Sequence, residues 1–417
     1  MRHKQVERWN FAVFVLSIVT LRMGWIFKTE TVIMPGFLDY LGASGAVRGM
    51  LPLIARVGQS LPQLILAHWI APLSRHKGIF FWVLALQSAP WLILAFLLGQ
   101  REVWPAQRLT LLFLGLYALH WIACGGARLL RGVLQGKLIS ARQRGRLLAA
   151  SNFSSCLAAI GMALWLLPRW LAPVTPRYML LFVSVGSGFA VSALCVLALR
   201  ESEEKVEPRR RSFWEFTGAS AALLREDRDF RRFLAVALLA LVSLLLFPHY
   251  TVFGQRALGL KPGNYVELLV AQNLVIAFGS LIMGPLADCY GNRLALRLLL
   301  FIASGVPLLA LTLGHLPPPL GQRLYWSVFA CLGFTPVTMR ITLNYLLELA
   351  PRERYAQYLG TLNALQVVPL LFSPLIGAAI DWFSFEAVFL ACAGAIFAGA
   401  LLTYRLVEPR EVNSGAS

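Results

Sequence analysis

The chain of 417 residues is 58% hydrophobic and only 14% charged, whereas a soluble domain carries about 25% charged residues. Continuous apolar runs long enough to cross a bilayer recur along its whole length, which excludes an ordinary soluble protein and favours membrane-spanning helices over the alternating strands of a barrel. The net charge of +18 therefore reflects membrane topology, and we expect no nucleic-acid partner.

Twelve membrane-spanning helices are predicted, in two sets of six around a polar stretch. We expect an all-α integral membrane protein of two six-helix bundles related by pseudo-two-fold symmetry. The N-terminal bundle covers residues 1–200, a cytoplasmic linker covers 201–232, and the C-terminal bundle with a short cytoplasmic tail covers 233–417. The predicted spans are 11–38, 46–72, 78–98, 108–130, 147–168, 178–199, 233–253, 264–287, 293–314, 323–346, 356–380 and 385–406.

The basic residues predict the orientation of the chain. Most of the 38 Lys and Arg residues fall in the predicted segments on one side, which by the positive-inside rule is the cytoplasm and holds both termini. Arginine far outnumbers lysine, as in GC-rich genomes, and the loops are short, so we expect a bacterial inner (plasma) membrane.

The first span carries three charged residues, Arg22, Lys28 and Glu30, and charges inside a span are costly enough to be functional candidates. On an ideal helix Lys28 and Glu30 lie about 200° apart, so either the helix is irregular there or one side chain points to a neighbouring helix. Glu30 is the first candidate for proton coupling. The alternative is a structural ion pair with Lys28, Arg22 or Arg56.

The second span carries a polar stripe, because Arg48, Arg56, Gln59 and Gln63 fall on one face at helical spacing. A lipid-facing stripe would be prohibitive, so it faces protein or a water-filled cavity. Arg48 lies near the end of the span, where it could reach the interface by snorkelling. Arg56, Gln59 and Gln63 are better cavity candidates.

Other candidate residues occupy corresponding places in the two halves of the chain. Gln272 and Asn273 in the eighth span lie at the level of the polar stripe in the second span. Arg128 and Arg340 lie in the fourth and tenth spans, where they could bind a substrate anion, serve an inner gate, or snorkel to lipid phosphates. His120 and His249 also lie in spans, but a lone histidine there is more often part of the packing.

A polar stretch between the eighth and ninth spans recurs in degraded form between the second and third. The intact copy runs from Gly284 to Arg293, and the degraded copy from Ala71 to Gly78 keeps the Pro-Leu pair and the final glycine. Further matches at nearly constant spacing, such as Pro35 with Pro248, support an internal duplication.

The intact copy carries a family resemblance that covers nearly the whole chain. Twelve spans, a long middle loop and the pattern G-x-L-A-D-x-x-G-x-R resemble the major facilitator superfamily, whose loop signature is matched at Gly284, Leu286, Ala287, Asp288, Gly291 and Arg293. The resemblance implies two bundles around a central cavity and alternating access, with Gly284, Asp288, Gly291 and Arg293 as a cytoplasmic gate motif. It is silent about the substrate.

The chain departs from the family pattern in two places. Arg75 stands where the intact copy has Asp288, and it cannot act as an anionic helix cap. The fifth span also lacks the Gly-Pro-Gly-Gly pattern of proton-drug antiporters, which counts against drug efflux. The six cysteines form no CxxC pair, and no metal-spaced histidine cluster, nucleophile elbow or phosphate loop is found, so we expect neither an enzyme nor a metal or other cofactor.

Positive charge exceeds negative charge among the candidate cavity residues, which favours a substrate with a carboxylate or phosphate. We expect a monomeric secondary transporter for a small organic anion or amphipathic solute, in contact with membrane lipids and possibly coupled to protons. The alternatives are an exporter of hydrophobic compounds or lipids, and a transport-inactive sensor or scaffold.

Overall fold

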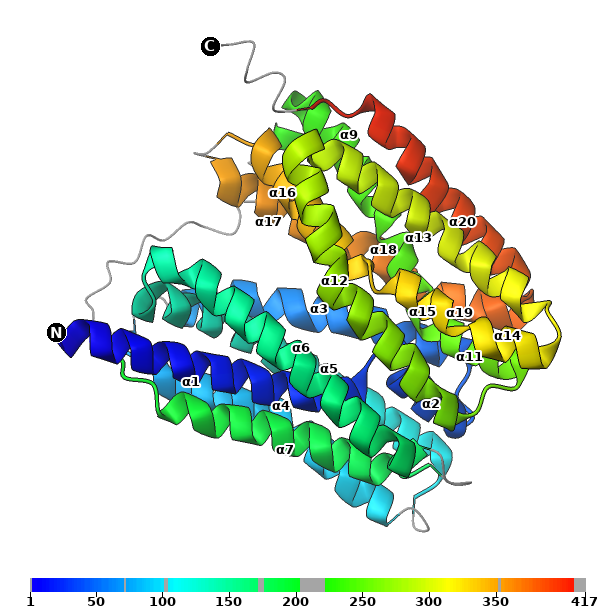
Figure 1. Cartoon of the computed structure of the whole chain (residues 1–417), viewed down its shortest axis with the longest axis horizontal. Helices are drawn as coiled ribbons and strands as arrows, with labels where there is room; N and C mark the ends of the chain where they lie inside the picture. Colours follow the sequence, from blue (N-terminus) through cyan, green and yellow to red (C-terminus); the bar gives the residue numbers. More distant parts are fainter. Residues whose placement is uncertain are drawn as a thin grey trace. The chain divides into compact units, whose positions relative to one another are not determined.

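A computed structural model describes residues 2–70, 73–100, 104–171, 176–202, 222–351 and 354–408 (Figure 1). Within these ranges the side chains of residues 2, 3, 61–65, 67–70, 141, 142, 145, 148, 149, 288 and 356 are not described. The described residues form helices and connecting segments, without any strand. The predicted all-α fold class is confirmed.

The first half of the chain is built from long helices that match the predicted spans. Its first span is interrupted and consists of α1, the short 3-10 helix η1, and α2. The bounds are α1 Arg2–Trp25, η1 Ile26–Lys28, α2 Ile33–Tyr40, α3 Gly45–Ile70, α4 Lys77–Gly99, α5 Ala106–Leu138, α6 Ala141–Leu171 and α7 Tyr178–Leu197.

The second half has more interruptions, because its seventh, tenth and eleventh spans are each built from three helices end to end. The bounds are α9 Arg228–Ala240, α10 Val242–Leu245, α11 Phe247–Leu258, η3 Pro262–Asn264, α12 Tyr265–Tyr290, α13 Asn292–Gly314, α14 Pro318–Leu324, α15 Trp326–Leu332, α16 Thr335–Leu349, α17 Tyr355–Leu365, α18 Val367–Leu371, α19 Ser373–Trp382, α20 Phe385–Leu402 and η5 Thr403–Arg405.

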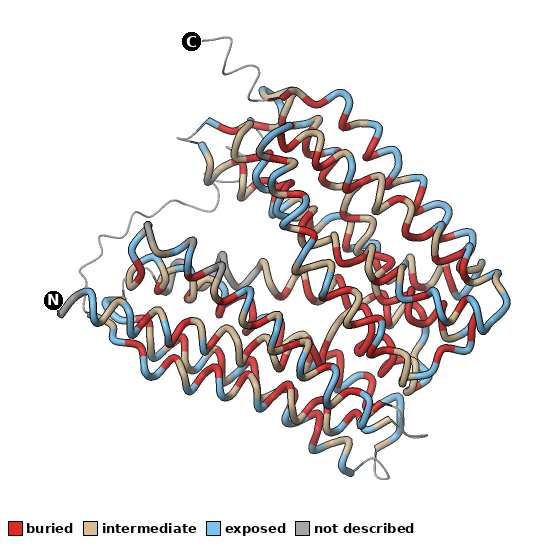
Figure 2. Tube along the Cα trace, in the orientation of Figure 1, coloured by how far each residue is buried: buried red, intermediate tan, exposed pale blue. Residues whose placement is uncertain are grey.

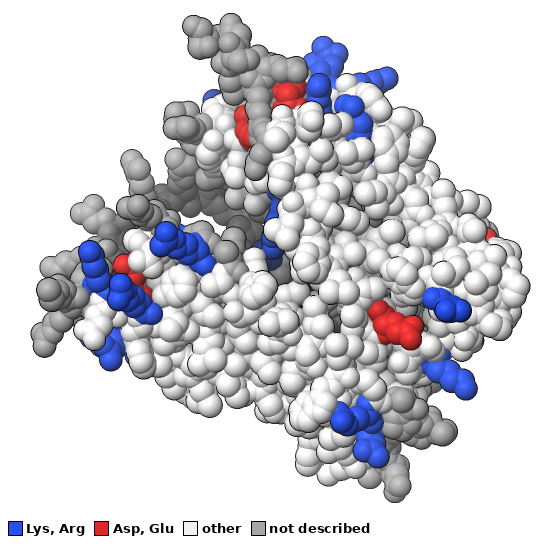
Figure 3. All heavy atoms as spheres, in the orientation of Figure 1, with Lys and Arg blue, Asp and Glu red and all other residues white. Residues whose placement is uncertain are grey.

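Eleven segments of the described chain are long and apolar enough to cross a membrane. Each of these segments corresponds to one predicted span. The remaining predicted span, the second in the chain at 46–72, corresponds to α3. Large apolar side chains are exposed on the helices, including Phe153 at 74% and Trp382 at 78%, as expected of a protein whose surroundings are lipid. Figure 2 shows buried and exposed positions alternating along the helices, and on the face in Figure 3 the charged side chains lie mainly near helix ends.

The chain divides into two compact units, each described here by itself. Unit 1 comprises Met1–Ala43, Ile54–Arg210 and Lys261–Val266, and unit 2 comprises Ser44–Leu53, Arg211–Leu260 and Glu267–Ser417. The first residues of α3 therefore pack with unit 2 while the rest of this helix packs with unit 1.

Each unit has its own buried core. In unit 1 the ring of Phe37 lies within 5.4 Å of the ring centroids of Phe113, Tyr178 and Phe182. In unit 2 Phe233 stacks on Tyr345 at 5.2 Å among buried aliphatic side chains. These contacts join helices that are distant in sequence, so they hold each unit together.

The start of α1 is attached to the end of α7. The Asn10 amide donates to the Arg200 carbonyl at 3.1 Å and accepts from the Arg200 backbone N–H at 2.8 Å. The Trp9 indole N–H donates to the Ala198 carbonyl at 2.8 Å. This end of the first span is therefore fixed within unit 1.

Candidate functional site

The candidate site of unit 1 is built around the interruption of the first span. After η1, Thr29 adopts an extended conformation with φ −61° and ψ 136°, and the α-helical pattern resumes only at Ile33. The carbonyl and hydroxyl oxygens of Thr29 then accept the N–H groups of Met34 and Ile33 at 3.0 and 3.3 Å. The helix is therefore irregular at this point, which is one of the two possibilities that the sequence left open.

Lys28 lies at this interruption and is fully buried. Its ammonium nitrogen lies 3.6 Å from the ring centroid of Trp25 and 4.2 Å from that of Trp121. The rings of Trp91 and Tyr117 follow at 5.9 and 6.0 Å. We call these four rings the aromatic cage. Within the described part of the chain, Lys28 Nζ has no hydrogen-bond partner, so the cage holds the cation while its N–H donors stay unused.

Glu30 has a different partner, although it lies only two residues from Lys28. The Tyr117 hydroxyl donates to Glu30 Oε1 at 2.7 Å. Among the residues described, no ion pair within 4.0 Å joins Lys28 to Glu30, and the two act on one another only through their longer-range field. A structural ion pair between them is therefore not what fixes their positions. Tyr117 contacts both the cation and the anion.

His120 lies beside the cage and was left outside the predicted site. The Trp91 indole N–H donates to His120 Nδ1 at 2.8 Å, and the same nitrogen lies 3.0 Å from the Gln87 carbonyl. An indole can only donate, so this contact needs an unprotonated Nδ1, whereas a hydrogen bond to the Gln87 carbonyl needs a protonated one. Nε2 has no hydrogen-bond partner among the described residues.

Further candidate residues of unit 1 lie on α1, α3 and α5. Gln59 is in hydrogen-bonding contact with Cys124, and the positive charges of Arg56 and Arg128 act on one another. Arg56 is half-buried, Arg128 is exposed, and Arg22 lies near Cys156 on α6. The side chain of Gln63 lies outside the described residues. Lys28, Glu30 and the Arg56–Gln59 part of the stripe thus belong to one unit.

Other candidates belong to unit 2. Gln272 and Asn273 are buried, and the Asn273 amide donates to the Leu269 carbonyl of its own helix at 2.8 Å. Arg340 is exposed. Arg48 does not snorkel, because its side chain is fully buried and lies 3.8 Å from Asp381, whose carboxylate also accepts the Gly45 N–H at 2.5 Å.

The polar stretch from Gly284 to Arg293 is mostly helical. Residues 284–290 form the end of α12, and Gly291 alone, with φ 86° and ψ 154°, connects it to α13. The side chain of Asp288 lies outside the described residues. Arg293 Nε lies 3.5 Å from Glu408, and its guanidinium donates to the Leu406 carbonyl at 3.2 Å. Arg293 is therefore attached to the segment after the last span.

In the degraded copy, the backbone is bound by a carboxylate from outside the repeated stretch, that of Glu201. Glu201 accepts the backbone N–H groups of His76 and Lys77, at 2.9 and 2.8 Å, and the Lys137 ammonium at 3.1 Å. Burial alone would raise the pKa of Glu201, but the hydrogen bonds from His76 and Lys77 and the charge of Lys137 outweigh it and lower that pKa. His76 and Lys77 are thus engaged within the protein.

Comparison with known proteins finds a family similarity in the second half of the chain. Residues 267–417 match the model of the Major Facilitator Superfamily. The predicted resemblance is confirmed. The last 151 residues of this chain are thus similar to that family. Within the described residues, no group of three or more His, Cys, Asp or Glu side chains could hold a metal ion.

Solved transporter structures share the fold over nearly the whole chain. The nucleoside transporter NupG has a TM-score of 0.67 and 14% identity over 97% of this chain and 99% of its own. A mutant of the peptide transporter POT in complex with sulfate has a TM-score of 0.68 and 13% identity over 97% and 98%. A bacterial homolog of the human lysosomal transporter Spinster, inward-facing and occupied, has a TM-score of 0.66 and 14% identity over 96% and 97%. No curated protein sequence matches this chain.

Proposed function

We propose that this chain is a secondary active transporter that works by alternating access and carries a small organic anion, with Glu30 as the proton-coupling residue. The observation that carries the proposal is the buried ammonium of Lys28, whose hydrogen-bond donors have no partner among the described residues. A buried charge without partners is costly and is retained for a function. The similar structures named as nucleoside and peptide transporters support a solute-carrying role.

The interruption of the first span supports the location of the proposed substrate site at Lys28. In membrane transporters, discontinuous helices commonly form the substrate and coupling-ion sites. The unused donors are those of Lys28 Nζ, and a carboxylate or phosphate would supply the acceptors that they need. The rings of the cage would contact an apolar part of the same solute. The bacterial inner membrane and cytoplasmic termini are part of this proposal.

Glu30 is suited to proton coupling because it lies close to the site cation without being paired to it. In the ionised state the Glu30 carboxylate accepts a hydrogen bond from the Tyr117 hydroxyl. After protonation, the carboxyl group of Glu30 can itself donate a hydrogen bond. A change in the charge of Glu30 would alter the field at Lys28 and therefore its affinity for an anion. This links proton and solute binding through two residues of one segment.

The test begins with a thermal-shift screen of purified protein against carboxylates and phosphates, since a ligand at about 100 times its Kd stabilises by about 2.7 kcal/mol. A stabilising anion is then used for uptake into proteoliposomes with and without an imposed pH gradient. Lys28→Met should abolish uptake, whereas Lys261→Met, at an exposed lysine of a connecting segment, should leave it unchanged. Glu30→Gln should keep exchange but remove the response to the gradient.

The alternatives predict other outcomes. Stabilisation by uncharged amphipathic compounds and lipids alone, with Lys28→Met still active, would favour an exporter of hydrophobic compounds or lipids. Anion binding without any exchange across the vesicle membrane would favour a sensor or scaffold. Gradient-driven uptake that survives Glu30→Gln would remove Glu30 from the coupling role.

A further inference from the structure

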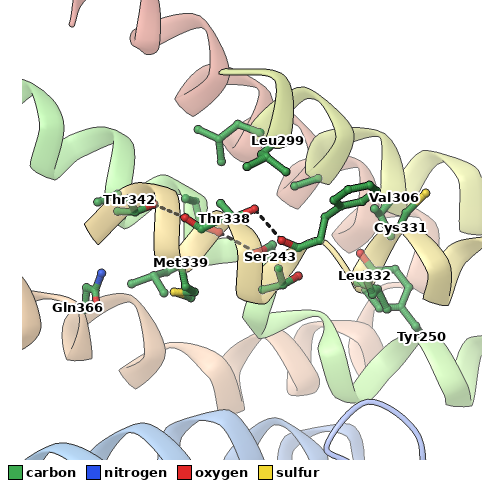
Figure 4. A pocket seen from close by; sticks show the side chains of 17 residues that line it. Ser243, Tyr250, Leu299, Val306, Cys331, Leu332, Thr338, Met339, Thr342 and Gln366 are labelled. Atoms are coloured by element: carbon green, nitrogen blue, oxygen red, sulfur yellow. Dashed lines mark hydrogen bonds between the residues drawn. The ribbon is translucent and has the colours of Figure 1, made fainter. Parts of the chain in front are cut away.

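The pocket of unit 2 shown in Figure 4 is too small for a solute. Its volume is about 20 Å³, which is room for about one water molecule. None of the 17 lining residues is charged, and the hydroxyl groups of Ser243, Thr338 and Thr342 already donate to backbone carbonyls. Unused hydrogen-bond donors are found instead on the surface of unit 1, where α1 begins and α7 ends.

Arg200 lies over the ring of Trp9 at this end of unit 1. The guanidinium carbon is 5.0 Å from the ring centroid, and Trp9 is 46% exposed. The Asn10 side chain binds both the N–H and the carbonyl of Arg200, so the backbone beneath the guanidinium is fixed. The guanidinium N–H groups themselves have no acceptor among the described residues.

A second exposed cation, Arg8, immediately precedes that ring in the sequence. The acidic residues closest in sequence are used elsewhere, because Glu7 accepts the Ser140 N–H at 2.8 Å and Glu201 binds the backbone at the start of α4. Within the described part of the chain, neither Arg8 nor Arg200 has an ion-pair partner. Figure 3 shows Lys and Arg side chains gathered at the end of unit 1 that holds the N-terminus.

An exposed apolar stripe leads from this end along α7. The Trp9 indole binds the carbonyl of Ala198, at the end of α7. Leu194 and Val191 lie about one and two helical turns earlier on the same face, and both are exposed. Helices α1 and α7 pack side by side (Figure 1). Tryptophan and basic residues at the end of such a span commonly lie at the level of the lipid head groups.

We propose that Arg8, Trp9 and Arg200 bind the phosphate head group of an anionic glycerophospholipid, with an acyl chain along the stripe on α7. A guanidinium can donate two parallel N–H bonds to a phosphate. Two positive charges without counter-ions favour a lipid of net negative charge, because the cation of a zwitterionic head group would oppose them. This site is separate from Lys28 and does not rest on the proposed transport.

The test uses delipidated full-length protein and two lipids with the same acyl chains, dioleoylphosphatidylglycerol and dioleoylphosphatidylcholine. Native mass spectrometry gives the affinity for the first lipid bound. Each basic residue near an anionic lipid contributes about fivefold, so we expect a preference of about 25-fold for phosphatidylglycerol. Arg200→Gln should reduce this preference to about fivefold, and the double variant Arg8→Gln, Arg200→Gln should abolish it.

A matched control removes the same charge elsewhere. Arg108→Gln, Arg323→Gln changes two exposed arginines, near the start of α5 and in α14, and should keep the preference. The denaturation midpoint without lipid should be equal in all variants, because these side chains are exposed and Asn10 binds only the backbone of Arg200. Glycerol 1-phosphate, which has the phosphate without acyl chains, should not displace the lipid at equal concentration.

Four outcomes would overturn the proposal. Equal affinity of the parent protein for the two lipids, a measurement that needs no variant, would show that no site selects the anionic head group. A preference that survives the double variant would place the binding elsewhere. An equal loss of preference in the control would mean that only the total charge matters. Displacement by glycerol 1-phosphate would show that the stripe on α7 contributes nothing.

Discussion

Glu201 caps helix α4 from outside its own loop, with its carboxylate 2.8 Å from the backbone N–H of Lys77, the first residue of the helix. In the intact copy of the repeated stretch an aspartate is part of the motif, whereas here Arg75 occupies that position. The negative charge that a helix N-terminus favours is therefore supplied from the segment after α7.

Removing this cap should destabilise unit 1. Glu201→Ala leaves the His76 and Lys77 N–H groups and the Lys137 ammonium without their acceptor, and we expect a loss of about 1–3 kcal/mol. The readout is the thermal denaturation midpoint in detergent. Glu226→Ala removes an exposed carboxylate and should leave the midpoint nearly unchanged. Equal midpoints for the two variants would show that the cap contributes nothing.

The contribution of Glu201 should depend on pH. Because its pKa is lowered in the folded protein, the stabilisation is fully present above the pKa of glutamate in the unfolded chain. It is lost as the pH falls through the lower pKa of the folded state. The difference in midpoint between the parent and Glu201→Ala should therefore shrink toward acid pH. The comparison is made in a His76→Gln background, which removes the nearby imidazole, and a constant difference would contradict the assignment.

Lys28 should lower the stability of the folded protein, because its ammonium is buried. Lys28→Met replaces a buried ammonium by an apolar side chain of similar length, so we expect a higher denaturation midpoint together with loss of transport. In a double-mutant cycle, Trp25→Leu should cost about 1–2 kcal/mol more in the parent than in the Lys28→Met background, because the cation–aromatic contact exists only in the parent. Additive effects would mean that Trp25 does not hold the ammonium.

A close helix contact in unit 2 should respond to a single methyl group. A Cβ atom at Gly377 would overlap the backbone oxygen of Gly45, so Gly377→Ala must separate the start of α3 from α19 and strain the Arg48–Asp381 pair. We expect a lower denaturation midpoint. Gly394→Ala, in α20, meets open space and should raise stability by about 0.5–1 kcal/mol. Shifts of the same sign in both variants would contradict the close approach.

The sequence predicted the spans well because hydropathy over a long run depends on many residues. It also located Lys28 and Glu30, because charges in apolar runs are conspicuous. Where their side chains point could not be predicted, since the aromatic cage joins the first span to residues 91, 117 and 121. The spacing of Tyr117, His120, Trp121 and Cys124 on one face of α5 was the signal that could have indicated this wall.

Other misses have the same origin. From the sequence, Arg48 was interpreted as an arginine at the end of a span that could reach the interface. Asp381 is 333 positions away along the chain, and only tertiary packing brings the two residues together. Glu201 reads as the first residue of a linker because its partners lie in a loop more than one hundred residues earlier. The local sequence pattern identifies a charged residue in an apolar stretch. Which oppositely charged residue pairs with it is decided by contacts between segments that are distant in the sequence.

The interruption after Trp25 divides the first span into two helical parts, α1 and α2. At residues 26–32 the α-helical hydrogen bonds are interrupted, and the side chains of Phe27 and Val32 there are buried. The α1 side is anchored by Asn10 to Arg200. The α2 side is packed through Phe37 against Phe113 and Tyr178, so Lys28 and Glu30 lie at a break in the helix whose two sides are both fixed within unit 1.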